Sequence, residues 1–104
     1  MNPVNLFTSM NNALKREMSI THEEFLRIFN SAFARYIINQ GPDFINMEIA
    51  GAKVKIYLNP EMNKKIASLE WVVTEVELDL SNLPEQAAVR FLSRFERAFY
   101  KGGG

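Results

Sequence analysis

The sequence predicts a two-layer α+β domain in the order α-α-β-β-β-α, with a three-stranded antiparallel meander packed on helices. Apolar residues recur every three or four positions near both ends of the chain and every second position in its middle. The 104 residues, 47% of them hydrophobic, match one globular domain. We place this single domain at residues 1–101 and expect residues 102–104 to be a disordered glycine tail.

A first helix is predicted from residue 2 to about residue 18. Asn2 followed by Pro3 is a typical helix start, because proline is tolerated in the first turn. The apolar residues of its expected buried face are Val4, Phe7, Met10, Leu14 and Met18. Several Asn, Ser and Thr residues lie between them and form helices poorly, so tertiary packing is expected to hold this helix.

A second helix is predicted over residues 22–40. Thr21 and Glu24 have the spacing of a capping box, and Ile20 and Phe25 have that of a hydrophobic staple. Its apolar stripe consists of Phe25, Ile28, Phe29, Ala32, Phe33, Tyr36 and Ile37, and its stop signal of Gly41 and Pro42.

Alternation with a period of two predicts two strands between residues 44 and 58. Their apolar sets are Ile45, Met47 and Ile49, and Val54, Ile56 and Leu58. A two-residue Gly51-Ala52 loop keeps both sets on one face, whereas a three-residue loop would separate them. This register pairs residue 49 with residue 54, sets Glu48 opposite Lys55 and predicts a type II′ turn.

A third strand is predicted over residues 69–80, after a polar connection at residues 59–68 with room for one helical turn. One parity holds Val72, Val76, Leu78 and Leu80, and the other holds Glu75, Glu77 and Asp79. Leu69, Trp71 and Val73 share the acidic parity. Two explanations are open: a bulge flips the strand, or both of its faces are apolar there.

The last helix is predicted to be capped by Asn82, with Pro84 in its first turn and Glu85 at the N3 position. Its buried face consists of Ala88, Phe91, Leu92, Phe95 and Phe99. The second and last helices would cover one face of the sheet. The first helix would then cover the other face or dock on another chain.

Composition excludes several classes of protein. No cysteine is present, so disulfides and thiolate sites are absent, which favours a cytoplasmic protein. Twelve basic residues balance twelve acidic ones, so no global field attracts nucleic acid or anionic lipid. We find no basic leader and no apolar run of membrane-spanning length, so no membrane partner is expected.

Catalytic patterns are weak. His22 is the only histidine and lies at a helix start, where a solvated role is expected. The row Glu75, Glu77 and Asp79 has a spacing at which carboxylates hold a metal or act as acid and base. Lys53 and Lys55 on the neighbouring strand favour a charge-paired sheet face instead. We therefore expect no enzyme, no catalytic residues, no metal and no cofactor.

Two partial resemblances follow from these elements. Helix, three strands and helix from residue 22 onward are similar to the double-stranded RNA-binding domain, and Gly41-Pro42-Asp43 resembles its strand lead-in. That family clamps phosphates with a lysine-rich helix start, whereas residues 84–88 here are Pro, Glu, Gln, Ala and Ala. Residues 14–29 resemble the first two helices of phage-repressor helix-turn-helix domains, with Thr21 in a familiar place, but the turn glycine is missing.

The sequence therefore predicts a small non-enzymatic protein-binding or regulatory adaptor, of the kind that phages and bacteria encode. Its expected binding surface is an apolar outer sheet face of Phe44, Tyr57, Leu69, Trp71 and Val73. We expect a homodimer with Trp71 as the central anchor and the first helix contributing Phe7 or Met10. The alternative is nucleic-acid binding through the basic stripe Arg90, Arg94, Arg97 and Lys101 of the last helix.

Overall fold

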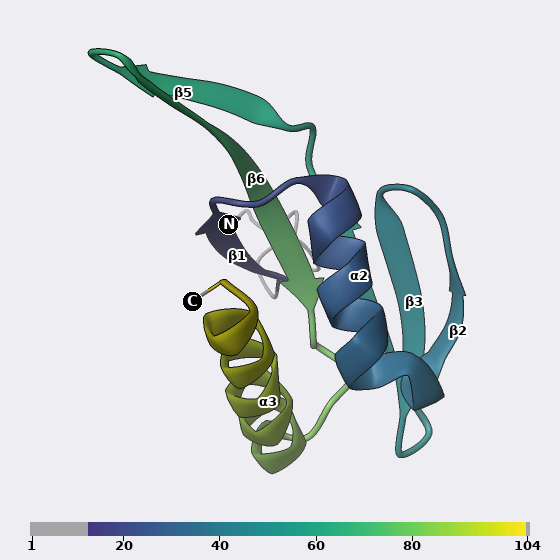
Figure 1. Cartoon of the computed structure of the whole chain (residues 1–104). Helices are drawn as coiled ribbons and strands as arrows, with labels where there is room; N and C mark the ends of the chain where they lie inside the picture. The colour runs from purple at the N-terminus through teal and green to yellow at the C-terminus, as the bar shows by residue number, and fades with distance from the viewer. Residues whose placement is uncertain (1–12, 104) are drawn as a thin grey trace, which may run out of the picture.

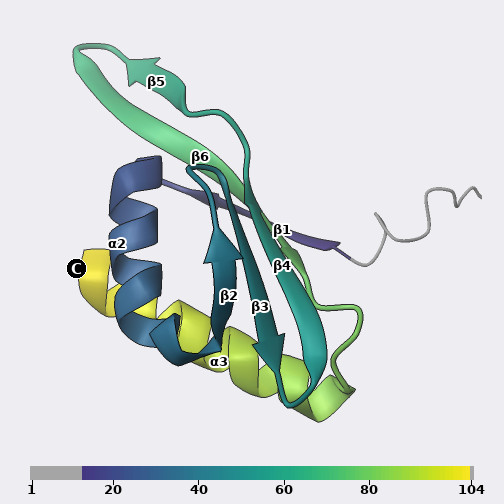
Figure 2. The same cartoon turned by 90° about the vertical axis from the view of Figure 1, so that its right-hand side faces the viewer.

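The computed structural model describes residues 13–103, with the side chains of residues 13–100, as a six-stranded antiparallel sheet with two helices (Figures 1 and 2). The elements in chain order are β1 (Ala13–Met18), α2 (His22–Phe33), the 3-10 turn η1 (Ala34–Tyr36), β2 (Ile37–Gln40), β3 (Phe44–Ile49), β4 (Ala52–Leu58), β5 (Met62–Ile66), β6 (Leu69–Asp79) and α3 (Glu85–Gly103). The strands lie in the order β1-β6-β4-β3-β2, and β5 pairs with β6. The α+β class holds, but the predicted element order and the three-stranded meander are wrong.

Residues 13–18 form the edge strand β1, where the sequence predicts the end of a helix. β1 pairs with the second half of β6, which sets Leu14 opposite Leu78 and Met18 opposite Thr74. Apolar residues four positions apart fit both a helix and a strand, so the spacing from Leu14 to Met18 does not discriminate between them. The rest of the predicted first helix lies outside the described residues.

The second predicted helix is too long. α2 starts at His22 as expected but ends at Phe33, and the chain then turns through η1 into β2. Ile37 of β2 lies opposite Met47 of β3 in an antiparallel pair. Ile37 and Ile38 are β-branched, which lowers their helix propensity, and pairing with β3 satisfies backbone groups that would otherwise form an open edge.

The β3–β4 hairpin turns one residue earlier than predicted. Ile49 pairs with Ala52, so the central residues of the turn are Ala50 and Gly51. Their φ angles are 51° and 84°, and two positive values are typical of type I′ rather than type II′. The shift moves the register by two, which keeps both apolar sets on one face but sets Lys53, not Lys55, opposite Glu48.

The predicted connection at residues 59–68 contains the strand β5, so this prediction is wrong. β5 continues along the same side of β6 as β4 does, with one extra residue between the pair Leu58↔Val76 and the pair Met62↔Val73. The third predicted strand is confirmed as β6. Val73 and Thr74 are both buried, so both faces of β6 are covered at this point, although Thr74 is polar and donates to the Ile20 carbonyl.

Helices α2 and α3 pack against each other on one face of the sheet (Figure 2). Phenylalanine rings from both helices form a continuous cluster with ring centroids 4.6–6.3 Å apart. Its members, all predicted as core residues, are Phe25, Phe29, Phe33, Phe91, Phe95 and Phe99. None of the helices in the described residues is both long and apolar enough to cross a bilayer.

The last helix starts later than predicted, so the prediction of Asn82 as its cap and Glu85 as its N3 residue is wrong. The helix begins at Glu85, directly after Pro84, and the Asn82 side-chain amide donates a hydrogen bond to the Lys53 carbonyl at 3.4 Å. Asn82 therefore links the helix start to β4. At its other end the helix extends through Gly103, into the predicted glycine tail, and Gly104 lies outside the described residues.

Candidate functional site

The β5–β6 hairpin extends beyond the two helices as a two-stranded ribbon (Figures 1 and 2). Strand alternation and the pairing of β5 with β6 place four apolar residues, Met62, Ile66, Leu69 and Trp71, on one side of it, together with Lys64, which lies directly opposite Trp71. Ile66 is 66% exposed, Leu69 67% and Met62 50%, while Trp71 is partly exposed. We call these four residues the apolar ribbon face.

Polar contacts hold the base of the ribbon. The His22 backbone N–H donates to Glu61 Oε2 at 2.7 Å, and His22 Nε2 donates to the Asn59 carbonyl at 2.7 Å. The Asn59 side-chain amide donates to the Glu75 carbonyl at 3.1 Å and to Glu77 Oε2 at 2.9 Å. The start of α2 and the strand β6 therefore both fix the point where β4 passes into β5, and the predicted solvated role of His22 is wrong.

Lysines lie along the exposed strand of the ribbon. Lys64 Nζ lies 3.3 Å from Glu17 Oε2 of β1, and Lys65 Nζ lies 3.7 Å from Glu70 Oε2 of β6. Lysine on an edge strand disfavours backbone pairing with another strand, because that pairing would crowd or desolvate the charge. Lys64 lies on the same side as the apolar ribbon face, where its ammonium group is paired with Glu17, and Lys65 lies on the opposite side. A partner on the apolar ribbon face therefore covers one existing ion pair, whereas backbone pairing at the β5 edge would crowd both lysines.

Strand parity places the five residues of the predicted outer surface on the sheet face that carries no helix. Phe44 and Tyr57 lie directly opposite each other and are 36% and 46% exposed. Leu69 and Trp71 belong to the ribbon. Val73 is only 2% exposed, so it offers little surface to a partner.

The predicted surface is not continuous. Tyr57 faces Glu77 across the β4–β6 pair, and the next position toward the ribbon holds Asn59 and Glu75, whose polar contacts are described above. These side chains separate Phe44 and Tyr57 from the apolar ribbon face. The predicted surface therefore consists of two separate parts, the aromatic pair of Phe44 and Tyr57 on the body of the sheet and the apolar ribbon face.

Sequence reasoning missed two members of the apolar ribbon face. Met62 and Ile66 lie in the segment that the sequence predicts as a connection. Their spacing with Lys64 is that of a strand, and Ala67 with Ser68 forms a two-residue turn in which Ala67 has a φ of 56°. The alternation was the available signal, but Pro60 and two adjacent lysines made it weak.

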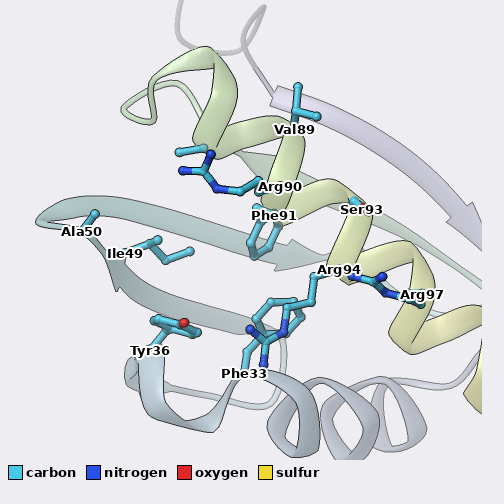
Figure 3. Close-up of a pocket in the computed structure, with 11 residues that line it drawn as sticks. Phe33, Tyr36, Ile49, Ala50, Val89, Arg90, Phe91, Ser93, Arg94 and Arg97 are labelled. Carbon is cyan, nitrogen blue, oxygen red and sulfur yellow. The ribbon is translucent and has the colours of Figure 1, made fainter.

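Three of the four residues of the predicted basic stripe line a groove on the helical side of the molecule (Figure 3). The groove has a volume of about 530 Å³ and lies between α3, η1 and the β3–β4 turn. The side chain of Lys101 lies outside the described part of the chain. We call this the arginine groove and define it by Tyr36, Ile49, Ala50, Arg90, Phe91 and Arg94, with Arg97 at its end.

Arg94 crosses from α3 toward α2 and η1 (Figure 3). Its Nη2 donates to the Ala32 carbonyl at 3.1 Å, and its guanidinium carbon lies 5.4 Å from the Phe33 ring centroid and 6.0 Å from that of Tyr36. Arg94 therefore braces two elements through a cation–π stack and one hydrogen bond.

The acidic row of β6 is paired with other groups. Glu75 and Glu77 accept from Asn59, while Asp79 faces Lys55 and accepts from the Ser81 hydroxyl at 2.7 Å. Within residues 13–100, no three His, Cys, Asp or Glu side chains are grouped so that they could hold a metal ion. Lys55 lies opposite Asp79, as a charge-paired sheet face requires, but no ion pair joins the two among those of the described residues.

Comparisons with protein-family models, with curated proteins and with solved structures give no match for this chain.

Proposed function

We propose that this protein is a small, non-enzymatic protein-binding module that acts through the apolar ribbon face. The observation that supports this is the two-thirds exposure of Ile66 and Leu69 beside the partly exposed Trp71, on a ribbon that extends beyond the helices. Large apolar side chains gathered on an exposed surface are typical of protein interfaces. Trp71 is the natural anchor, because tryptophan is enriched among the residues that dominate binding energy.

The partner in this proposal is a second copy of the chain. A two-fold axis brings the same face of both ribbons together, so each apolar ribbon face covers the other. Lysines on β5 disfavour pairing through its edge. In face-to-face packing, the Lys64–Glu17 ion pair of each chain lies within the contact beside Trp71. Twelve basic and twelve acidic residues leave no net charge to oppose self-association.

The remaining parts of the proposal rest on composition. Absence of cysteine favours a reducing compartment, so we propose a cytoplasmic protein. Its 104 residues and simple domain suit a regulatory protein of phage or bacterial type. The proposed module uses no cofactor.

Nucleic-acid binding through Arg90, Arg94 and Arg97 is the weaker alternative. Arg94 already stacks on the rings of Phe33 and Tyr36, so these aromatic faces are not free to stack on bases. The chain carries no net charge to add long-range attraction. A gel shift that weakens steeply with salt and is lost in Arg90→Glu would favour this alternative.

The proposal is tested by measuring molar mass with light scattering at micromolar concentration. We expect a dimer for the wild type and a monomer for the double variant Ile66→Ser/Leu69→Ser, because both substitutions remove apolar surface from the proposed interface. Val89→Ser/Tyr100→Ser is the matched control. It removes two side chains that are 60% and 85% exposed on α3, and it should remain dimeric.

Circular dichroism of each variant checks that the fold is intact. The replaced ribbon residues are exposed in the single chain, so their loss should change helix content little. A monomeric wild type, or a double variant that remains dimeric, would contradict the proposal.

A further inference from the structure

The elements that line the arginine groove, the first half of α3 and the β3–β4 turn, lie at the opposite end of the molecule from the ribbon (Figure 1). The apolar lining of the groove comes from Ile49 and Ala50 at the β3–β4 turn, Phe91 on α3 and the ring of Tyr36. Its volume of about 530 Å³ falls in the range of ordinary ligand sites, and it is partly open to solvent. A groove of this size and openness suits a short extended segment of chain.

Its charged groups are all basic. Arg90, Arg94 and Arg97 line the groove, and no carboxylate pairs with any of them among the ion pairs of the described residues. Each guanidinium carries five N–H donors in a planar fork that matches a carboxylate. These donors are therefore available to an acidic ligand.

Arg94 is already held in place. Its stacking on Phe33 and Tyr36 and its bond to the Ala32 carbonyl fix the guanidinium across the groove, while that bond uses only one of its donors. A prearranged arginine loses less conformational freedom when it binds a carboxylate. Arg90 extends from α3 and lines the same groove as Ile49 and Ala50, so the groove combines apolar and cationic surface (Figure 3).

We propose that the arginine groove binds an acidic, partly apolar peptide segment of a partner protein. Carboxylates would bind Arg90 and Arg94, and an apolar side chain of the segment would lie on Ile49 and Phe91. Charge complementarity supports an acidic ligand. The apolar lining favours a peptide over nucleic acid, whose bases need free aromatic faces, because Arg94 already covers Tyr36 and Phe33.

The test uses fluorescence anisotropy with the full chain and a labelled peptide of about ten residues in which Glu and Leu alternate. Peptides that alternate Lys with Leu, or Glu with Ser, separate the charge requirement from the apolar one. A labelled single-stranded oligonucleotide of mixed sequence tests the nucleic-acid outcome. Arg90→Gln removes one of the three positive charges that line the groove, and Arg27→Gln removes an exposed arginine on α2 outside the groove as the matched control.

We expect the Glu-Leu peptide to bind more tightly than the other probes, with affinity that falls as salt rises. Arg90→Gln should weaken it about tenfold, the size expected for a charge-assisted hydrogen bond, while Arg27→Gln should leave it unchanged. Amide shifts at Ile49 and Ala50 on titration should locate the peptide in the groove.

Absence of peptide binding, equal binding by Arg90→Gln and wild type, or tighter binding of the oligonucleotide would overturn the inference. The double variant Ile66→Ser/Leu69→Ser should bind the peptide as the wild type does. Failure of the ribbon proposal and failure of the groove proposal are thus separate results.

Discussion

Thr21 starts α2 with one half of a capping box. Its Oγ1 accepts a hydrogen bond from the Glu24 backbone N–H at 3.1 Å, as the sequence predicts. The other half is missing from the hydrogen bonds of the described residues, because the Glu24 carboxylate binds the Arg27 guanidinium instead. This hydrogen bond from Arg27 holds the pKa of Glu24 below its ordinary value. Thr21 is therefore the main side-chain cap of this helix.

The Thr21 cap can be tested by substitution. Thr21→Ala should lower the free energy of unfolding by about 1 kcal/mol, because it leaves the Glu24 N–H without its partner. Thr21→Ser keeps the hydroxyl and should lose much less. Urea unfolding followed by circular dichroism measures both. Equal losses in the two variants would show that the threonine methyl, not the hydrogen bond, stabilises the helix start.

Individual core residues are predicted well on the helices and on the central strands, where Ile45 and Ile56 are buried as expected. Phe25 and Phe29 on α2, and Phe91 and Phe95 on α3, are buried as predicted, because the helical period depends on one segment alone. Val73 is also buried, although its parity placed it on the outer face. Its burial depends on how the ribbon joins the body, which no local pattern reports.

The β3–β4 turn can form in two registers that differ little in burial. Glycine at the first central position favours a type II′ turn over Gly51 and Ala52, yet the chain turns over Ala50 and Gly51. Both registers place the apolar sets on the core side, so burial does not decide between them. The observed turn requires Ala50 to adopt a φ of 51°, which is unfavourable for a residue with a Cβ.

Glycine substitutions distinguish the two turns. Ala50→Gly should raise the free energy of unfolding by about 0.5 kcal/mol, because relief of the positive φ exceeds the entropy gained by the unfolded chain. Ala52→Gly should lower it by about 1 kcal/mol, because Ala52 lies in β4. Thermal unfolding with matched reversibility measures both. The opposite order of stability would support the Gly51-Ala52 turn.

The short strands β2 and β5 are not predicted from the sequence. β2 has four residues and β5 has five, and their polar content reads as a helix end and a connection. β2 pairs with β3, and β5 pairs with β6. The stability of each short strand therefore comes from this pairing rather than from a strong alternation of apolar residues in its own sequence. Long elements with a clear period, such as α3 and β6, were predicted closely.

In the whole molecule, three strands that the sequence does not predict, β1, β2 and β5, enlarge the sheet, while the core is as expected. Edge strands β1 and β2 enlarge the sheet on both sides, and β5 extends the β6 hairpin away from the helices. Leu69 and Trp71 were predicted as part of an apolar surface, but the ribbon that carries them was not. The arginines of α3 were predicted as a stripe, whereas the groove beside them depends on η1 and the β3–β4 turn.

Self-association through the apolar ribbon face can be followed directly with Trp71. Trp71 is the only tryptophan in the chain and lies partly exposed on that face. Packing of two ribbons would remove water from its indole ring, whereas an interface elsewhere would leave the ring unchanged. Tryptophan emission moves to shorter wavelength in a drier environment, so it separates these two arrangements.

The most direct measurement is therefore Trp71 emission as a function of protein concentration, recorded beside the molar mass of the same samples. We predict a blue shift that follows the rise from monomer to dimer mass, and a midpoint at higher concentration for Leu69→Ser because that variant loses apolar contact. An emission maximum that stays constant while the mass doubles, or a mass that stays monomeric throughout, would contradict the account.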